Sequence, residues 1–419
     1  MDVFSSMILP LSSEQIIVLQ YLQAILLLLF LPFSGLIIAG TTISLLYRRK
    51  ALTTNDKKYL ELSEKIISIC TINKSMGAAA GLLPALALFM TNMQLIYING
   101  SQIGVFLFVA LTAYCAGLIL IYVYRYSFSF NRYYNSGIYG LVLISFAVII
   151  YLSSMSFSVF PEKWLQTKSI LSLVFSADVL TRVLFFCSAS LAITSVFLIF
   201  MIFYWNEGKN TFTDEQKRIV KKNSTGFIFL CSVLAPLFMF AGILVLPERA
   251  LSASVYGYLL IAVILVLFVY IFTYAMLKDR KEKYSGYIFV MLLFVFFANT
   301  IKDQAASRNA TALHSIQVNM EYAKYIQTLS AGSGEEISEA KGEEVYKRIC
   351  ITCHRFDQKL VGPPYKETLP KYEGKIDELA AFISNPVKKN PGYPAMPNQN
   401  LKPGEAKSVA KYILEQYKK

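Results

Sequence analysis

The chain has 419 residues, of which 55% are hydrophobic and 14% aromatic, and its formal net charge is +13. This composition excludes an ordinary soluble globular protein and is typical of a polytopic membrane protein. The basic residues gather between long apolar stretches, so we interpret the positive charge as a sign of membrane topology and not of nucleic-acid binding.

Long apolar stretches make up most of the chain. We count eight of them, and each reaches or nearly reaches the roughly 20 residues that a helix needs to cross the hydrocarbon of a bilayer. They cover residues 16–46, 76–98, 102–124, 138–157, 180–205, 224–247, 255–277 and 285–301. The sequence therefore predicts an all-α fold with a polytopic transmembrane bundle over residues 1–301, whose last helix continues past its apolar part.

Basic residues crowd into alternate connections between these stretches, at 48–74, 125–132, 209–222 and 278–283. The other connections hold few basic residues, chiefly Lys163, Lys168 and Arg249. The positive-inside rule places the basic connections in the cytoplasm. Because the number of spans is even, we expect both termini on the outer side of the membrane.

Acidic side chains are nearly absent from the predicted spans, which argues against a proton pathway or a transport site, because such sites normally have buried ionisable groups at mid-membrane. The ionisable residues Asp178, Arg182, Glu248 and Arg249 fall near the outer ends of spans. We interpret the side-chain amides in and beside the spans as hydrogen-bonding contacts between packed helices, with contact to a quinone or a lipid head group as the alternative. These amides are Gln20, Gln23, Asn92, Gln94 and Asn299.

Residues 302–334 are expected to form an extracytoplasmic helix and a linker. Apolar residues recur there at helical spacing, and the helix is expected to project outward or to lie against a partner. His314 is interpreted as an interface or surface residue, with a ligand role as the alternative. The run Ala331-Gly332-Ser333-Gly334 predicts a flexible hinge.

The run Cys350-Ile351-Thr352-Cys353-His354 is the C-x-x-C-H attachment signature of a covalently bound c-type haem. In this chemistry the two thiols form thioethers with the porphyrin vinyl groups, and the adjacent histidine becomes the proximal iron ligand. A zinc site or a redox dithiol is the alternative for the two cysteines. A zinc site would need further Cys or His ligands nearby, and the tail has none beyond His354.

Two further residues of the tail are candidates for the haem site. Met396 is the only methionine after Met320, and it lies between prolines on a loop, so we predict it as the sixth iron ligand. Pro363 of the Gly362-Pro363-Pro364 turn is predicted to offer its carbonyl to the free ring nitrogen of His354. Such a bond would fix the orientation and tautomer of the imidazole.

The tail as a whole, residues 335–419, resembles a class I monohaem cytochrome c. The resemblance rests on the haem run, the Gly-Pro turn, the methionine loop and two flanking helices marked by Gly342, Tyr346, Val409, Tyr412 and Ile413. It implies a small α-helical domain with one haem c, in which the first and last helices cross. Haem c is attached on the outer side of the bacterial inner membrane, so the tail is expected in the periplasm, in agreement with the loop charges.

The first three spans resemble those of subunit I of the cytochrome bd oxidases. The resemblance rests on Leu19-Gln20-Tyr21, on Leu29-Phe30-Leu31-Pro32 followed by Gly35 and Gly40, on the run Ile72 to Gly81 after the charged stretch 51–71, and on Tyr124-Arg125-Tyr126. It implies that this chain sits beside a haem-bearing catalytic subunit of a similar complex.

The chain departs from that family at the haem ligands. Leucines around Leu27 and the segment from Arg182 to Cys187 stand where the family has ligating histidines, and the paired glutamates of the third helix are missing from 102–124. The chain has only two histidines, His314 and His354, and neither lies in a predicted span. We therefore expect it to ligate no haem b or haem d.

These observations favour an electron-transfer subunit of a bd-type-oxidase-like respiratory oxidoreductase, with no catalytic residue of its own. Lysines near the haem run and the methionine loop are candidates for steering an acidic redox partner to the haem edge, with solvated surface charge as the alternative. These are Lys359, Lys366, Lys388, Lys389 and Lys402. One alternative function is a stand-alone membrane-anchored cytochrome c that shuttles electrons between periplasmic partners, and another is a transporter or haem-based sensor.

Overall fold

A computed structural model describes residues 11–96, 103–126, 134–163, 174–205, 212–279, 281–332, 338–388 and 391–418. Every regular element within these ranges is helical, and no strand occurs there, which confirms the predicted all-α fold. The chain divides into two compact units, Met1–Glu321 and Tyr322–Lys419, which we call the membrane unit and the tail unit.

The membrane unit contains the predicted spans. Within the described ranges, eight helical segments are long and apolar enough to cross a membrane, and each overlaps one predicted stretch. Their elements are α1 (Ser13–Thr54), α3 to α4 (Lys74–Met76, η2 Gly77–Leu82, Leu83–Ile96), α5 (Ile103–Tyr126), α6 (Tyr134–Val159), α8 with η5 (Ala177–Ile199, Phe200–Trp205), α9 (Asp214–Val245), α10 (Ala253–Asp279) and α11 (Tyr284–Ala310). As expected, the last of them continues beyond its apolar part.

Shorter elements connect or follow the spans. These are α2 (Lys57–Thr71), η4 (Pro161–Lys163), η6 (Glu248–Ala250) and α12 (Ala312–Gly332). Two of the long helices, α1 and α9, begin at capping boxes, in which the Ser12 and Thr213 hydroxyls each accept from the backbone N–H three residues on. Asn55 ends α1 in the left-handed conformation (φ 49°), which asparagine tolerates better than most residues, and so turns the chain into α2.

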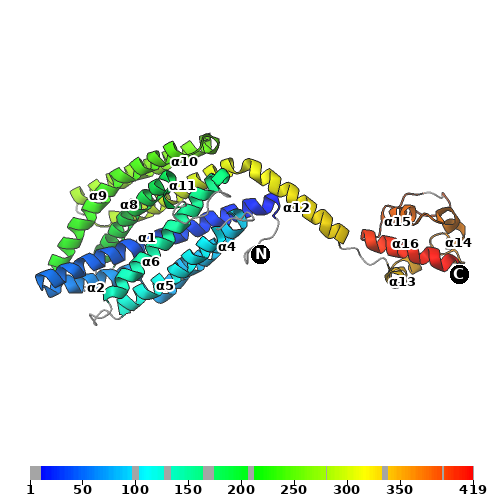
Figure 1. Ribbon diagram of the computed structural model, residues 1–419, viewed down its shortest axis with the longest axis horizontal. Coiled ribbons are helices and arrows are strands. Elements are labelled where there is room, and N and C mark those ends of the chain that lie inside the picture. The colour runs from blue at the N-terminus through cyan, green and yellow to red at the C-terminus, as the bar shows by residue number, and fades with distance from the viewer. Residues whose placement is uncertain are drawn as a thin grey trace. The chain divides into compact units, whose positions relative to one another are not determined.

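Helices α1 and α8 form the centre of the membrane unit. Their most apolar stretches are 67% and 72% buried, against 28% for α9 and 33% for α10. Helix α1 contacts α4, α6, α8 and α11 and runs through the bundle, whereas α9 and α10 lie at its edge (Figure 1). The outer faces of α9 and α10 are therefore left for lipid or for another membrane protein.

The tail unit is a small helical domain. Its elements are α13 (Glu339–Arg348), η7 (Cys350–Thr352), α14 (Tyr365–Thr368), η8 (Leu369–Tyr372), α15 (Ile376–Ser384) and α16 (Pro403–Lys418). Helices α13 and α16 cross at Gly342, where an added Cβ would lie 2.6 Å from Tyr412 Cβ and closer still to the Ser408 backbone. This is the crossing of first and last helices that the resemblance to class I cytochromes implies.

The predicted domain boundaries at 301 and 334 stay predictions. Helix α11 continues through residue 301 without a break, and α12 reaches Gly332. The predicted hinge begins with Ala331 and Gly332, which belong to α12, while Ser333 and Gly334 lie outside the described residues.

Candidate haem centre

The haem run folds into one tight turn directly after α13. The backbone N–H groups of Cys353 and His354 both donate to the Cys350 carbonyl, at 3.1 and 2.9 Å. The turn brings the two thiols and the imidazole to the wall of the same cavity, and the thiols are not joined to each other. Two vinyl groups and one iron can be reached together from such a turn.

The imidazole of His354 is oriented by the Gly-Pro-Pro turn. Its Nδ1 lies 3.0 Å from the Pro363 carbonyl oxygen, which can only accept a hydrogen bond, so Nδ1 carries the proton. The lone pair of Nε2 is therefore available to a metal. The turn itself is held by the Gly362 N–H, which donates to the Cys353 carbonyl at 2.9 Å.

Glycine is needed at position 362 because of how closely the ring approaches. An added Cβ there would lie 2.7 Å from both His354 ring nitrogens, closer than real Cβ contacts occur. Any side chain at this position would push the imidazole away from the Pro363 carbonyl. The position of the His354 ring therefore depends on glycine at position 362 of the turn.

A cavity of about 180 Å³ lies beside the turn. Cys350, Cys353 and His354 line it together with Met396, which is half-buried on the loop that follows α15. Apolar and aromatic side chains make up much of the remaining wall, including Leu369, Tyr372, Phe382, Ile383, Val387 and Ile413. An apolar cavity with two thiols, an imidazole and a thioether fits a covalently attached haem.

The zinc alternative finds no support in the donor set. Across the described ranges, no group of three or more His, Cys, Asp or Glu side chains could hold a metal ion. Burial raises the pKa of the Cys350 thiol to about 11, so without attached haem it stays protonated at neutral pH. Burial therefore adds the cost of deprotonating this thiol to any binding of zinc.

Tyr365 also lines the haem site, although the sequence did not predict it. Its ring lies parallel to the His354 imidazole, with 5.2 Å between centroids and 7° between planes. The signal available was its position directly after the Gly-Pro-Pro turn, but an aromatic residue there has no chemistry that singles it out. Burial raises the pKa of its hydroxyl well above the ordinary value, so Tyr365 is neutral and acts as an aromatic wall.

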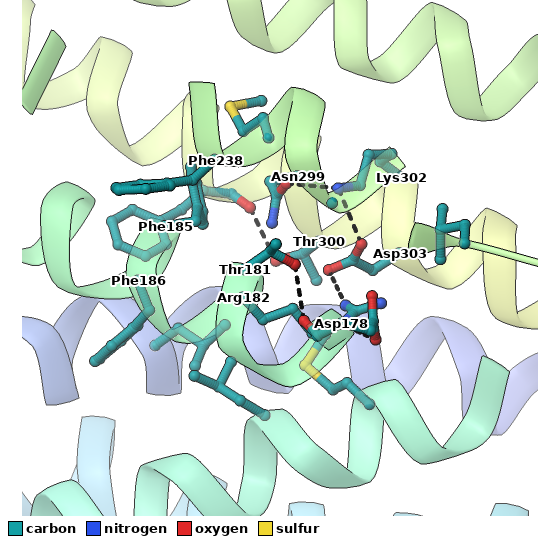
Figure 2. A pocket seen from close by; sticks show the side chains of 17 residues that line it. Asp178, Thr181, Arg182, Phe185, Phe186, Phe238, Asn299, Thr300, Lys302 and Asp303 are labelled. Carbon is teal, nitrogen blue, oxygen red and sulfur yellow. Dashed lines mark hydrogen bonds and ion pairs between the residues drawn. The ribbon is translucent and has the colours of Figure 1, made fainter. Parts of the chain in front are cut away.

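A second set that the sequence did not reveal lies in the membrane unit. Asp178, Arg182, Lys302 and Asp303, here called the charged quartet, are each less than a tenth exposed. Arg182 pairs with Asp178 at 2.8 Å and with Asp303 at 2.5 Å, and Lys302 lies 3.2 Å from Asp303. Figure 2 shows the quartet at one side of a cavity of about 30 Å³, with Phe185, Phe186 and Phe238 at the other. Asp178 and Arg182 of α8 are thus buried against Lys302 and Asp303 of α11.

Two of the amides in the spans, Gln23 and Asn92, hydrogen-bond between helices. Gln23 of α1 donates to the Asn92 side chain of α4 at 2.9 Å, and Gln304 of α11 donates to Gln23 at 2.7 Å. Asn299 accepts from Lys302 at 3.0 Å and so extends the charged quartet. The bonds of Gln23 and Asn92 agree with the interpretation of these amides as packing contacts, whereas the Asn299 bond lies within α11.

The fold and the geometry of the tail unit define a c-type cytochrome domain. Comparison with known proteins agrees: residues 338–413 match the family described as cytochrome c oxidase, cbb3-type, subunit III. Cytochrome c-551 of Azotobacter vinelandii is 43% identical over 77 residues, which are 17% of this chain and 94% of that protein.

Two further relatives show the same similarity. Cytochrome c-551 of Pseudomonas denitrificans is 38% identical over 78 residues (17% of this chain, 94% of that protein), and cytochrome c-552 of Nitrosomonas europaea is 32% identical over 82 residues (18% and 79%). Through its C-terminal domain, the chain belongs to the cytochrome c family. This membership implies a covalently bound haem c, electron transfer and redox partners.

Proposed function

We propose that this chain is an electron-transfer subunit of a bacterial respiratory oxidoreductase that resembles the bd oxidases, with its haem c in the periplasm. One observation carries the proposal: a chain with eight candidate membrane spans in its described part also holds Cys350, Cys353, His354 and Met396 in the wall of one cavity. The partner subunit holds the catalytic centre, and this chain moves single electrons to or from it.

The residues around the cavity suit rapid one-electron exchange. Cys350 and Cys353 would hold the porphyrin, and His354 Nε2 and the Met396 sulfur would hold the iron; the bound haem would supply the one-electron redox chemistry. The Pro363 carbonyl keeps the proton on His354 Nδ1 and so fixes the orientation of the imidazole. Two neutral ligands and apolar walls would raise the reduction potential.

The membrane unit supports a role within a larger complex. A single helix would anchor a cytochrome, so a bundle with a buried centre at α1 and α8 and open faces on α9 and α10 suits contact with another membrane subunit. Neither histidine of the chain lies in a span, so any haem b or haem d would belong to that partner. This division of labour is the one that the resemblance to bd subunit I implies.

The lysines near the cavity differ in their surroundings. Lys388 is exposed and lines the cavity, so it is the best placed to attract an acidic redox partner. Lys366 is paired with Asp357, and Lys359 lies over the Tyr393 ring at 4.8 Å, so both are partly engaged within the domain. Lys389 lies outside the described residues.

Copurification tests the proposed complex. The full chain, tagged and extracted in mild detergent, is expected to come out with a partner subunit and to show haem b or haem d absorbance besides haem c. If it comes out alone with only a c-type spectrum, the alternative of a stand-alone anchored cytochrome c replaces the proposal. The C-x-x-C-H run and the cavity support electron transfer under either outcome.

Replacing Met396 by alanine tests the ligand assignment. Loss of the thioether is expected to open the sixth position of the iron and to lower the reduction potential, by on the order of 100 mV. Redox titration and carbon monoxide binding measure both effects, with the exposed Met320→Ala as the matched control. An unchanged spectrum and potential in the Met396→Ala protein would contradict the assignment.

A further inference from the structure

We propose that Tyr365 is a positioning residue that sets the rotation of the His354 imidazole about the bond from Nε2 to the haem iron. The inference rests on His354 as the axial ligand. The two rings are parallel within 7°, and their centroids lie 5.2 Å apart, which is the offset-stacked arrangement that aromatic rings prefer. A flat neighbour of this kind opposes rotation of the imidazole out of its plane.

The imidazole is held at two further points. The Pro363 carbonyl holds the Nδ1 edge of the ring at 3.0 Å, and the close backbone of Gly362 leaves no space for the ring to swing toward it. The hydrogen bond alone fixes one edge and tolerates a tilt of the ring. The stacked Tyr365 ring adds the second restraint, because it fixes the plane of the imidazole ring.

Tyr365 can act in this way because it is itself immobile. It is 8% exposed, and its N–H donates to the Arg355 carbonyl at 3.0 Å. Its ring lies 5.3 Å from the Phe356 ring and 6.3 Å from the Tyr346 ring, and Tyr346 in turn lies 5.6 Å from Tyr412. The plane of the imidazole is thus connected through packed rings to the crossing of α13 and α16.

The test uses the full chain with haem attached and compares three variants. In Tyr365→Leu the flat neighbour is lost, in Tyr365→Phe the ring stays and only the hydroxyl is lost, and Tyr417→Leu is the matched control. Tyr417 is a half-buried tyrosine of α16 that packs against the core of the tail unit and does not line the cavity. Electron paramagnetic resonance of the oxidised haem reports the imidazole orientation through the g values.

We expect Tyr365→Leu to shift and broaden the largest g value, while Tyr365→Phe and Tyr417→Leu keep the g values of the natural protein. Unchanged g values in Tyr365→Leu, or an equal shift in Tyr417→Leu, would overturn the proposal. If Tyr365→Leu does not assemble, an experimental map of the natural protein decides, because His354 and Tyr365 rings that are not parallel beside the bound haem also overturn it. A natural protein without a low-spin signal would instead refute His354 and Met396 as ligands.

Discussion

Replacing Arg182 by methionine is expected to destabilise the membrane unit by about 3–5 kcal/mol, because it breaks a buried ion-pair network from its centre. Arg182 is the one member of the charged quartet that contacts both carboxylates, Asp178 at 2.8 Å and Asp303 at 2.5 Å. Asp303 would keep Lys302 at 3.2 Å, but Asp178 would lose its paired guanidinium in a buried position. The cost arises mainly from this unpaired charge.

Unfolding of the full chain in mixed micelles, followed by circular dichroism, measures this effect. Arg249→Met is the matched control, because Arg249 pairs with Glu162 where both side chains are about half exposed, and such pairs contribute about 0–1 kcal/mol. Adding Asp178→Asn to Arg182→Met should recover part of the loss, since Asp303 keeps its pair with Lys302 and no unpaired carboxylate then remains. Equal stabilities of the Arg182 and Arg249 variants would show that the quartet is not a buried network.

The spans could be predicted because the thickness of the bilayer sets a length for apolar helices. The residues at which the helices begin and end could not be predicted. Helix α1 runs from Ser13 to Thr54, well beyond the apolar stretch 16–46, because its flanks have good helix formers and caps although they are polar. Hydropathy predicts which part of a helix can contact the hydrocarbon of the membrane, whereas hydrogen bonding and capping determine the residue at which the helix ends.

The charged quartet escaped prediction for a related reason. Asp178 and Arg182 lie near one end of α8, and Lys302 and Asp303 lie just beyond the apolar part of α11, so each pair alone resembles charges at a membrane interface. Their burial results from the packing of two helices that are more than a hundred residues apart in sequence. A single sequence carries no signal for that pairing.

The haem centre was more accessible to sequence reasoning because its chemistry fixes its residues. Thioether attachment demands two close cysteines, and an adjacent histidine follows from the reach of one turn, so Cys350, Cys353 and His354 stand out. Tyr365 did not stand out, because aromatic residues serve many purposes and its stacking depends on the exact path of the Gly-Pro-Pro turn. Residues that the haem chemistry itself requires can be recognised in a sequence. A residue that only positions another side chain through packing cannot be recognised in this way.

Replacing Gly342 by valine is expected to destabilise the tail unit by at least about 3 kcal/mol, at the upper end of what overpacking costs. The new Cβ would lie 2.6 Å from Tyr412 Cβ and closer still to the Ser408 backbone oxygen, and backbone atoms cannot rotate away as the end of a side chain can. Helices α13 and α16 would have to separate. The contact between Tyr346 and Tyr412, and with it the support of Tyr365, would be lost.

Because domains of this size are only marginally stable, a loss of that magnitude should appear in the cell as a lower content of attached haem. Haem content per chain and the thermal loss of the haem absorbance band measure it. Glu344→Ala is the control on the same helix, since this side chain is 71% exposed and its ion pair with Arg348 is long, at 3.8 Å. Gly342→Ala should give a smaller loss than Gly342→Val. A Gly342→Val protein with natural haem content and melting would mean that α13 and α16 are not in close contact at this residue.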